Sequence, residues 1–192
     1  KFLKEHKIKF CSFLCDSSHS LSVKLAENHN FKLTDIRITF EKKLNKTKSF
    51  KSKNLIFRIA KKEDITKISK LASHVYLSSR YYYDDKFQKS RVNLYYKDWV
   101  KKSVLGKFDD LCFILINKIN NQFLGFVTIK ENFDNSATIG IIGIDKKFQG
   151  QGFGSILLKY MQSYLLTKKI KTIVVITQGR NINAQKLYQK NG

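Results

Sequence analysis

The sequence predicts an α+β fold, in which a sheet is flanked by helices. Three runs of strand type follow one another directly, at residues 109–117, 123–131 and 137–144. A cluster of glycines then separates the third run from a stretch whose apolar residues recur at helical spacing. A wholly apolar run at 172–177 and a final helical pattern complete the order of elements.

The first fifty residues predict a small αβ segment. Residues 7–15 alternate as a strand does, residues 17–30 read as a helix, and residues 31–41 alternate again with an irregularity near Thr34. One helix and two strands form too small a core, so this segment is expected to pack against something else. Residues 42–54 are polar and lysine-rich, which predicts a linker and divides the chain into residues 1–50 and 51–192.

The second region begins with a strand at 55–60 and a helix that opens at Lys61. An aromatic-rich, partly polar stretch follows at 78–87, and a helix is expected from about 92 to 103. After the three strands, the glycines and their helix, Asn181 is expected to cap the last helix. One face of that helix is predicted to point inward through Ala184, Leu187 and Tyr188.

The segment I-G-I-I-G-I-D-K-K-F-Q-G-Q-G-F-G, residues 139–154, places glycines between a strand end and a helix start. The helical face that follows consists of Phe153, Ile156, Leu157, Tyr160, Met161, Tyr164 and Leu165. The first backbone N–H groups of a helix lack partners and carry partial positive charge. Because glycine lets a ligand approach the backbone closely, this arrangement favours a phosphate-binding loop. A tight turn without a ligand is the alternative reading of the same glycines.

Two common nucleotide-binding loops do not fit. No Lys-Ser or Lys-Thr follows the glycines, as the Walker loop requires, and Gly150, Gly152 and Gly154 give G-x-G-x-G rather than G-x-G-x-x-G. The pattern Q-x-x-G-x-G, from Gln149 to Gly154, resembles the acyl-CoA loop of the Gcn5-related N-acetyltransferase (GNAT) superfamily.

The order of elements over residues 55–192 also resembles the GNAT order, which implies a mixed, mostly antiparallel sheet flanked by helices. The resemblance implies acetyl-CoA as co-substrate, with its pyrophosphate on the glycine loop and its pantetheine arm paired along the preceding strand. The implied cofactor-binding residues are Ile142, Gly143, Ile144, Gln149, Gly150, Gln151, Gly152, Phe153, Gly154, Ser155 and Asn181. In this superfamily two further strands follow the L-Y-x-x-x-G stretch, so the chain, which stops at Gly192, is expected to lack them.

A narrower resemblance is to the TDP-fucosamine acetyltransferases, which acetylate a 4-amino-4,6-dideoxy sugar on a nucleotide. It rests on S-R-Y-Y-Y-D-D-K-F (79–87), L-Y-Y-K-D-W-V-K-K-S (94–103), V-V-I-T-Q-G-R-N (174–181) and N-A-Q-K-L-Y (183–188). It implies a nucleotide sugar as acceptor. Arg80, Tyr81, Tyr82 and Tyr83 are the candidate substrate-binding residues, since aromatic faces cover sugars or bases and arginine pairs with phosphate. A protein or peptide amine, and a non-catalytic acyl-CoA-binding module, are the alternatives.

Tyr188 matches the tyrosine that in this superfamily gives a proton to the departing CoA thiolate. A phenol remains protonated at neutral pH because its pKa is about 10. A simple packing role for the ring is the alternative. Asp84, Asp85 and Glu131 are candidates for the base that takes a proton from the amine, and no sequence feature selects among them.

Composition bounds the remaining function classes. The formal charge is +22, but the excess is mostly lysine and is spread along the chain, so no nucleic-acid partner is predicted. The three cysteines and four histidines show no metal-ligand spacing, so no metal is expected. No apolar run reaches the roughly 20 residues that span a bilayer. A cytoplasmic enzyme is therefore expected, and a homodimer is a further expectation.

Overall fold

The computed structural model describes residues 2–44, 50 and 52–192, and the chain divides into two units, Lys1–Thr34 and Asp35–Gly192. The smaller unit holds helices α1 (Phe2–Glu5) and α2 (Ser20–Asn28). His19 caps α2, because its Nδ1 accepts a hydrogen bond from the Ser22 N–H at 3.3 Å. The strand predicted at 7–15 does not form; among the described residues no strand pairs with this stretch.

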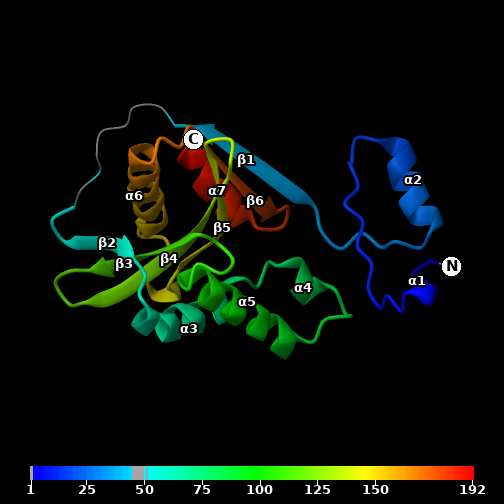
Figure 1. Ribbon diagram of the computed structural model, residues 1–192, viewed down its shortest axis with the longest axis horizontal. Helices are drawn as coiled ribbons and strands as arrows, with labels where there is room; N and C mark the ends of the chain where they lie inside the picture. Colours follow the sequence, from blue (N-terminus) through cyan, green and yellow to red (C-terminus); the bar gives the residue numbers. More distant parts are fainter. Residues whose placement is uncertain (1, 45–49, 51) are drawn as a thin grey trace. The chain divides into compact units, whose positions relative to one another are not determined.

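The larger unit is built on one six-stranded sheet with the order β1-β6-β5-β4-β3-β2 (Figure 1). Its strands are β1 (Arg37–Lys43), β2 (Leu55–Ile59), β3 (Leu111–Asn117), β4 (Gln122–Glu131), β5 (Ser136–Ile144) and β6 (Thr172–Gln178). Every neighbouring pair is antiparallel except β5 and β6, which are parallel. The predicted mixed, mostly antiparallel sheet is thus confirmed.

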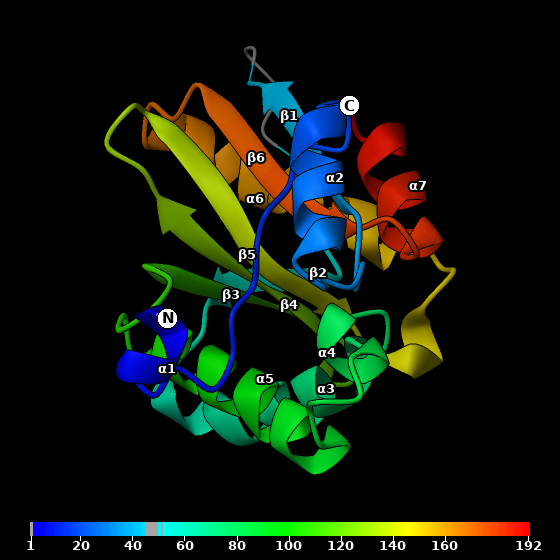
Figure 2. The ribbon, with the colours of Figure 1, turned by 90° about the vertical axis from the view of Figure 1, so that its right-hand side faces the viewer.

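Helices cover both faces of this sheet (Figures 1 and 2). The helices are α3 (Ile65–Val75), α4 (Arg80–Tyr83), α5 (Lys89–Val104), α6 (Phe153–Thr167) and α7 (Ile182–Lys190), with short 3-10 turns at Lys62–Asp64 and Lys146–Phe148. Side chains of α6 and α7 form one core with the sheet, and those of α3 and α5 form a second core on its other face. Strand β3 serves both, because its successive side chains point to opposite faces: Phe113 and Leu115 enter the first core, and Cys112 and Ile114 the second.

Strand β1 differs in position from the strand that the sequence predicts in the N-terminal region. The strand lies at Arg37–Lys43, later than the expected 31–41, and pairs antiparallel with β6 from Arg37 opposite Gln178 to Lys43 opposite Thr172. The larger unit therefore begins before the predicted linker at 42–54. Part of that linker, residues 45–49 and 51, falls outside the described residues. The edge of β6 provides backbone groups that need partners, and β1 supplies them.

Helix α3 is held to the sheet by a buried carboxylate at its start. Asp64 is fully buried and accepts hydrogen bonds from Arg58 Nη1 at 2.7 Å, from the Lys61 N–H at 2.8 Å and from Lys67 Nζ at 2.9 Å. Burial by itself would raise the pKa of Asp64, but the hydrogen bonds from Arg58, Lys61 and Lys67 outweigh it and lower that pKa. This anchor fixes the helix whose far end reaches the cleft described next.

Candidate active site

A cavity of about 1200 Å³ opens where β5 and β6 separate. The two strands are paired only from Ser136 opposite Thr172 to Ile139 opposite Val175. Beyond Ile139 they diverge, so the backbone of residues 140–144 of β5 and of residues 176–178 of β6 lines the cavity without bridging it. The volume exceeds the roughly 300–1,000 Å³ of an ordinary ligand pocket, which leaves room for two substrates.

A β-bulge shapes the β5 wall. Val127 of β4 is paired with Ile142 and Ile129 with Ile139, so Thr128 faces two residues of β5. Thr128 Oγ1 accepts the hydrogen bond of the Ile141 N–H at 3.0 Å. The bulge turns both Gly140 and Ile141 toward the α3–α5 face of the sheet.

The predicted glycine loop lies at the mouth of this cavity, between β5 and α6. Gly150 and Gly152 adopt φ angles of +78° and +84°, a left-handed conformation that favours glycine. Gly152 is the N-cap of α6 and no side chain caps the helix there, so the first N–H groups of α6 stay available to a ligand. Gln149 fastens the loop to the strand, because its Nε2 donates to the Ile144 carbonyl at 2.9 Å.

Gly154 has a separate role, since its φ is ordinary and the space beside it is full. A Cβ at this position would lie 3.1 Å from Leu187 Cδ1 of α7. Glycine thus allows α6 and α7 to pack closely, which brings Tyr188 to the cavity. The loop residues Gln149, Gly150, Gly152, Phe153, Gly154 and Ser155 all line the cavity, as do Ile142, Gly143 and Ile144 of β5. Gln151 does not; its side-chain amide donates to the Lys147 carbonyl at 3.0 Å.

Tyr188 reaches the cavity from α7 and belongs to the core as well. Its side chain is 8% exposed and its ring centroid lies 5.7 Å from that of Phe40 on β1. Burial raises the pKa of the Tyr188 phenol, so the group holds its proton at any physiological pH. None of the hydrogen bonds recorded over residues 2–44, 50 and 52–192 uses the Tyr188 hydroxyl.

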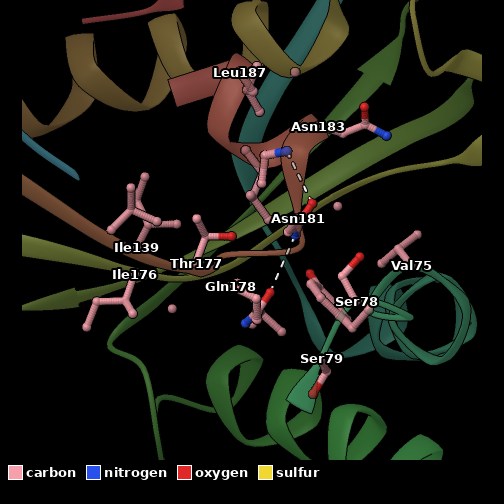
Figure 3. Close-up of a pocket in the computed structure, with 18 of the residues that line it drawn as sticks. Val75, Ser78, Ser79, Ile139, Ile176, Thr177, Gln178, Asn181, Asn183 and Leu187 are labelled. Carbon is pink, nitrogen blue, oxygen red and sulfur yellow. Dashed lines mark hydrogen bonds between the residues drawn. The ribbon is translucent and has the colours of Figure 1, made fainter. Parts of the chain in front are cut away.

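Asn181 caps α7 as predicted and lines the cavity. Its Oδ1 accepts the hydrogen bond of the Ala184 N–H at 3.2 Å, and its Nδ2 lies 3.5 Å from Gln178 Oε1 of β6 (Figure 3). Figure 3 also shows Ser78 and Ser79, which follow α3, around the same cavity as Thr177 of β6.

Two of the four predicted acceptor-binding residues line the cavity. Arg80 and Tyr81 do so, and the Arg80 guanidinium lies 4.9 Å above the centre of the Tyr81 ring. Tyr82 and Tyr83 are outside the lining: the Tyr82 hydroxyl donates to Asn93, and the Tyr83 ring lies 3.9 Å beneath the Arg180 guanidinium. The stretch 80–83 forms helix α4, so its side chains point in different directions.

None of the three carboxylates considered as a base lines the cavity. Asp84, Asp85 and Glu131 are all outside the lining, which contains Asp109 and Asp35 instead. Asp109 was not singled out from the sequence. Its signal there is faint: one of two adjacent acidic residues before an apolar strand, ten residues after the only tryptophan.

Tyr76, at the end of α3, is another tyrosine that lines the cavity, and the sequence pattern did not identify it as a site residue. Its hydroxyl is buried and has no hydrogen-bond partner among the described residues. Burial, followed by the neighbouring Tyr188, raises the pKa of Tyr76. Its ring stacks on that of Tyr96 of α5, with centroids 4.6 Å apart.

Over the part of the chain that the structure describes, no group of three or more His, Cys, Asp or Glu side chains is arranged to hold a metal ion. Within the same residues, no helix combines the length and the apolar character that crossing a membrane requires.

Comparison with known proteins links this geometry to one family. The sequence model of the "Acetyltransferase (GNAT) family" matches residues 59–192. The spore coat polysaccharide biosynthesis protein SpsD of Bacillus subtilis is 22% identical over 67% of this chain and 43% of its own length. N-alpha-acetyltransferase 30 of Dictyostelium discoideum is 29% identical over 50% of this chain and 53% of its own length. The chain thus spans about half the length of these curated relatives.

Among solved structures, the PaiA N-acetyltransferase of Thermoplasma acidophilum in complex with coenzyme A has the same fold. The match has a TM-score of 0.60 at 17% identity and covers 72% of this chain and 88% of the other. At this level of identity the likeness establishes the fold alone.

Proposed function

The chain belongs to the acetyltransferase (GNAT) family, and we propose on that basis that it transfers an acetyl group from acetyl-CoA to an amine. The observation that carries the proposal is the convergence of three features on one cavity: the uncapped start of α6, the unpaired edge of β5 and the side chain of Tyr188. An anion, an extended amide chain and a leaving thiolate are the ligands that these features suit.

Acetyl-CoA presents these three chemical groups in the matching order. The pyrophosphate lies on the N–H groups from Gly150 to Ser155, the pantetheine arm pairs along residues 142–144, and Asn181 contacts the CoA. A backbone N–H near Ile144 holds the thioester oxygen while negative charge develops on it. The neutral amine attacks the carbonyl carbon, the C–N bond forms, and the C–S bond breaks to release CoA thiolate.

Tyr188 then gives its proton to the thiolate sulfur and regains one from the attacking nitrogen or from water. Burial makes the phenol a weaker acid, yet the same dry environment also raises the proton affinity of the thiolate. The transfer therefore does not depend on the pKa values that the two groups have in water. The other proton that the ammonium form of the substrate carries goes to solvent, which balances the reaction.

For the acceptor we propose an amino-dideoxy sugar on a nucleotide, used in cell-surface polysaccharide synthesis. Arg80 and Arg37 line the same cavity as the aromatic side chains of α4 and α5, so guanidinium groups and ring faces are available to a diphosphate and a sugar. The similarity to a spore coat polysaccharide protein supports this class. Because the reaction draws on acetyl-CoA, we place the protein in the cytoplasm.

A peptide N-terminus is the second candidate acceptor, favoured by the 29% identity to an N-alpha-acetyltransferase. A single assay separates the two: release of CoA thiol from acetyl-CoA is measured with TDP-4-amino-4,6-dideoxygalactose and with short peptides. We expect turnover with the sugar nucleotide to exceed that with any peptide. The reverse order would replace the proposed acceptor and leave the proposed reaction intact.

Binding of the co-substrate is tested by thermal unfolding with acetyl-CoA. At 100 times its dissociation constant, a ligand that binds only the folded state adds about 2.7 kcal/mol to the free energy of unfolding. Absence of any shift with acetyl-CoA or CoA contradicts the proposed reaction. A shift without turnover on either class of acceptor points to an acyl-CoA-binding module.

A further inference from the structure

Asp109 is a buried carboxylate at the cavity wall without a cationic partner. Its side chain is 4% exposed, and its Oδ2 accepts hydrogen bonds from Trp99 Nε1 at 2.7 Å and from Ser103 Oγ at 2.8 Å. No salt bridge within residues 2–44, 50 and 52–192 includes it. Lys130, which lines the same cavity, pairs with the neighbouring Asp110 instead, at 3.1 Å. A carboxylate that is buried without a counter-charge is costly, so a ligand that supplies the charge is strongly favoured there.

The backbone of β5 keeps room for this carboxylate. Gly140 lies in the bulge, and a Cβ on it would be 2.6 Å from Asp109 Oδ2 and 2.8 Å from Oδ1. Any larger residue at 140 would push the carboxylate away. The glycine thus allows Asp109 to lie directly against β5, two residues before Ile142, where the pantetheine arm is proposed to begin pairing.

Aromatic rings surround the same end of the cavity. The rings of Tyr95 and Phe108 meet that of Trp99 edge to face, at centroid distances of 5.7 and 5.1 Å. Tyr81 in turn lies 5.3 Å from Tyr95. All four line the cavity with Asp109. Aromatic faces attract cations, and the attraction grows when water is excluded.

We propose that Asp109 is the binding residue for the acceptor amine, which it receives in the protonated form. The proposal rests on the proposed function and adds to it the charge of the acceptor on entry: a primary ammonium group that binds between the carboxylate and the aromatic rings. Asp109 Oδ1 is the accepting atom, because the two recorded hydrogen bonds to this side chain both use Oδ2. The carboxylate draws the nitrogen to the part of β5 beside which the thioester is placed.

A pair of small probes tests the charge selection without knowledge of the true acceptor. Benzylamine is protonated at neutral pH, and benzyl alcohol has nearly the same shape without the charge. We expect the wild-type protein with CoA bound to bind benzylamine about tenfold more tightly than benzyl alcohol. Equal affinity for the two probes overturns the proposal.

The place where benzylamine binds can be measured on the wild-type protein itself. Trp99 is the only tryptophan in the chain, and its indole N–H donates to Asp109. A single indole resonance therefore reports on this carboxylate in a ¹H–¹⁵N spectrum. We expect benzylamine to shift that resonance at concentrations that match its binding curve. Binding that leaves the indole resonance unmoved overturns the proposal, even if the variants described next fail to fold.

Two adjacent aspartates provide a matched pair of variants. Asp109→Asn removes the charge and keeps the shape, and should abolish the preference for benzylamine over benzyl alcohol. Asp110→Asn is the control, because Asp110 is exposed and contacts Lys130 and the Glu131 N–H instead of the cavity. It should keep the tenfold preference. A folded Asp109→Asn protein that keeps the preference overturns the proposal.

The outcomes separate this role from the proposed reaction. Stabilisation by acetyl-CoA should be the same in wild type and in both variants, since the glycine loop is unaltered. Loss of acetyl transfer with the ammonium preference intact would reject the reaction and keep the binding role of Asp109. Efficient acetyl transfer by Asp109→Asn, with an unchanged KM for the amine, would reject the role of Asp109 and keep the reaction.

Discussion

Replacing Tyr188 with phenylalanine separates catalysis from packing, because the change removes one hydroxyl and almost no volume. No recorded hydrogen bond uses that hydroxyl, so its loss leaves no buried partner unsatisfied within the described residues. The ring still fills the space beside Phe40. We therefore expect the melting temperature and the affinity for acetyl-CoA to stay close to wild type.

The rate is expected to fall instead. A positioned general acid contributes roughly 10²- to 10⁴-fold, and water in the cavity replaces part of that contribution. We expect kcat of Tyr188→Phe to fall by about 10- to 10⁴-fold, with little change in KM for acetyl-CoA.

Tyr188→Ala is the companion variant that measures the packing. The side chain is 8% exposed and part of the core beneath α6 and α7. Truncation of a buried aromatic residue costs about 3–5 kcal/mol. For a protein of this size each kcal/mol lowers the melting temperature by about 2–4 °C, so a decrease of at least about 6 °C is expected.

Steady-state kinetics and thermal melts on these two variants decide the matter. Pre-steady-state release of CoA establishes whether chemistry limits turnover. Unchanged kcat in Tyr188→Phe, with chemistry rate-limiting, refutes the acid role and leaves Tyr188 as a core residue.

Three further predictions concern the loop, the anchor and the surface. Gly152→Asp should weaken acetyl-CoA binding at least about tenfold, because the new carboxylate would lie against the pyrophosphate. The control is Gly106→Asp, since Gly106 is also a left-handed glycine with open surroundings. Equal affinities of the two variants for acetyl-CoA would contradict the assignment of the loop. Asp64→Asn should lower the free energy of unfolding by about 2 kcal/mol at pH 7. Because folding lowers the pKa of Asp64, its contribution to the free energy of unfolding is full above the ordinary pKa of 3.8 and is lost as the pH falls below that value. Urea unfolding curves of wild type and Asp64→Asn should therefore converge in acid. A stability difference that persists in acid would contradict the role of Asp64 as an anchor. Finally, duplex DNA should bind no more tightly than roughly micromolar at physiological salt, and tight binding with a steep salt dependence would show that the charge of +22 forms a nucleic-acid site.

Local sequence patterns were sufficient to predict most of the strands of the larger unit. Strands β3, β4, β5 and β6 lie within two residues of their predicted starts, because their apolar runs are bounded by polar turns. The N-terminal region was harder. Residues 7–15 alternate like a strand, but alternation describes only one partner of a pair, and among the described residues none pairs with it.

Some residues of the candidate site could likewise be predicted from local sequence, and others could not. The glycine loop is contiguous in sequence, so its residues could be predicted together, and Asn181 is recognisable as a cap from its position before a helix. Asp109 and Tyr76 owe their place to tertiary packing against Gly140 and Tyr96. No local pattern carries that information, whereas the run of tyrosines at 81–83 suggested a cluster that helix α4 disperses.

The pairing of β1 with β6 also bears on how the protein is made. Ribosomes synthesise chains from the N-terminus, so Arg37 is complete long before its partner Gln178. Until then β1 is an unpaired strand in a nascent chain, and among the strands that the structure describes its partner β6 is the last to emerge. Contacts between such distant positions are slow to form because a long loop must close first. Of the strands described, β1 and β6 should therefore be the last to pair, and until they pair the exposed β1 should make the nascent chain prone to aggregation.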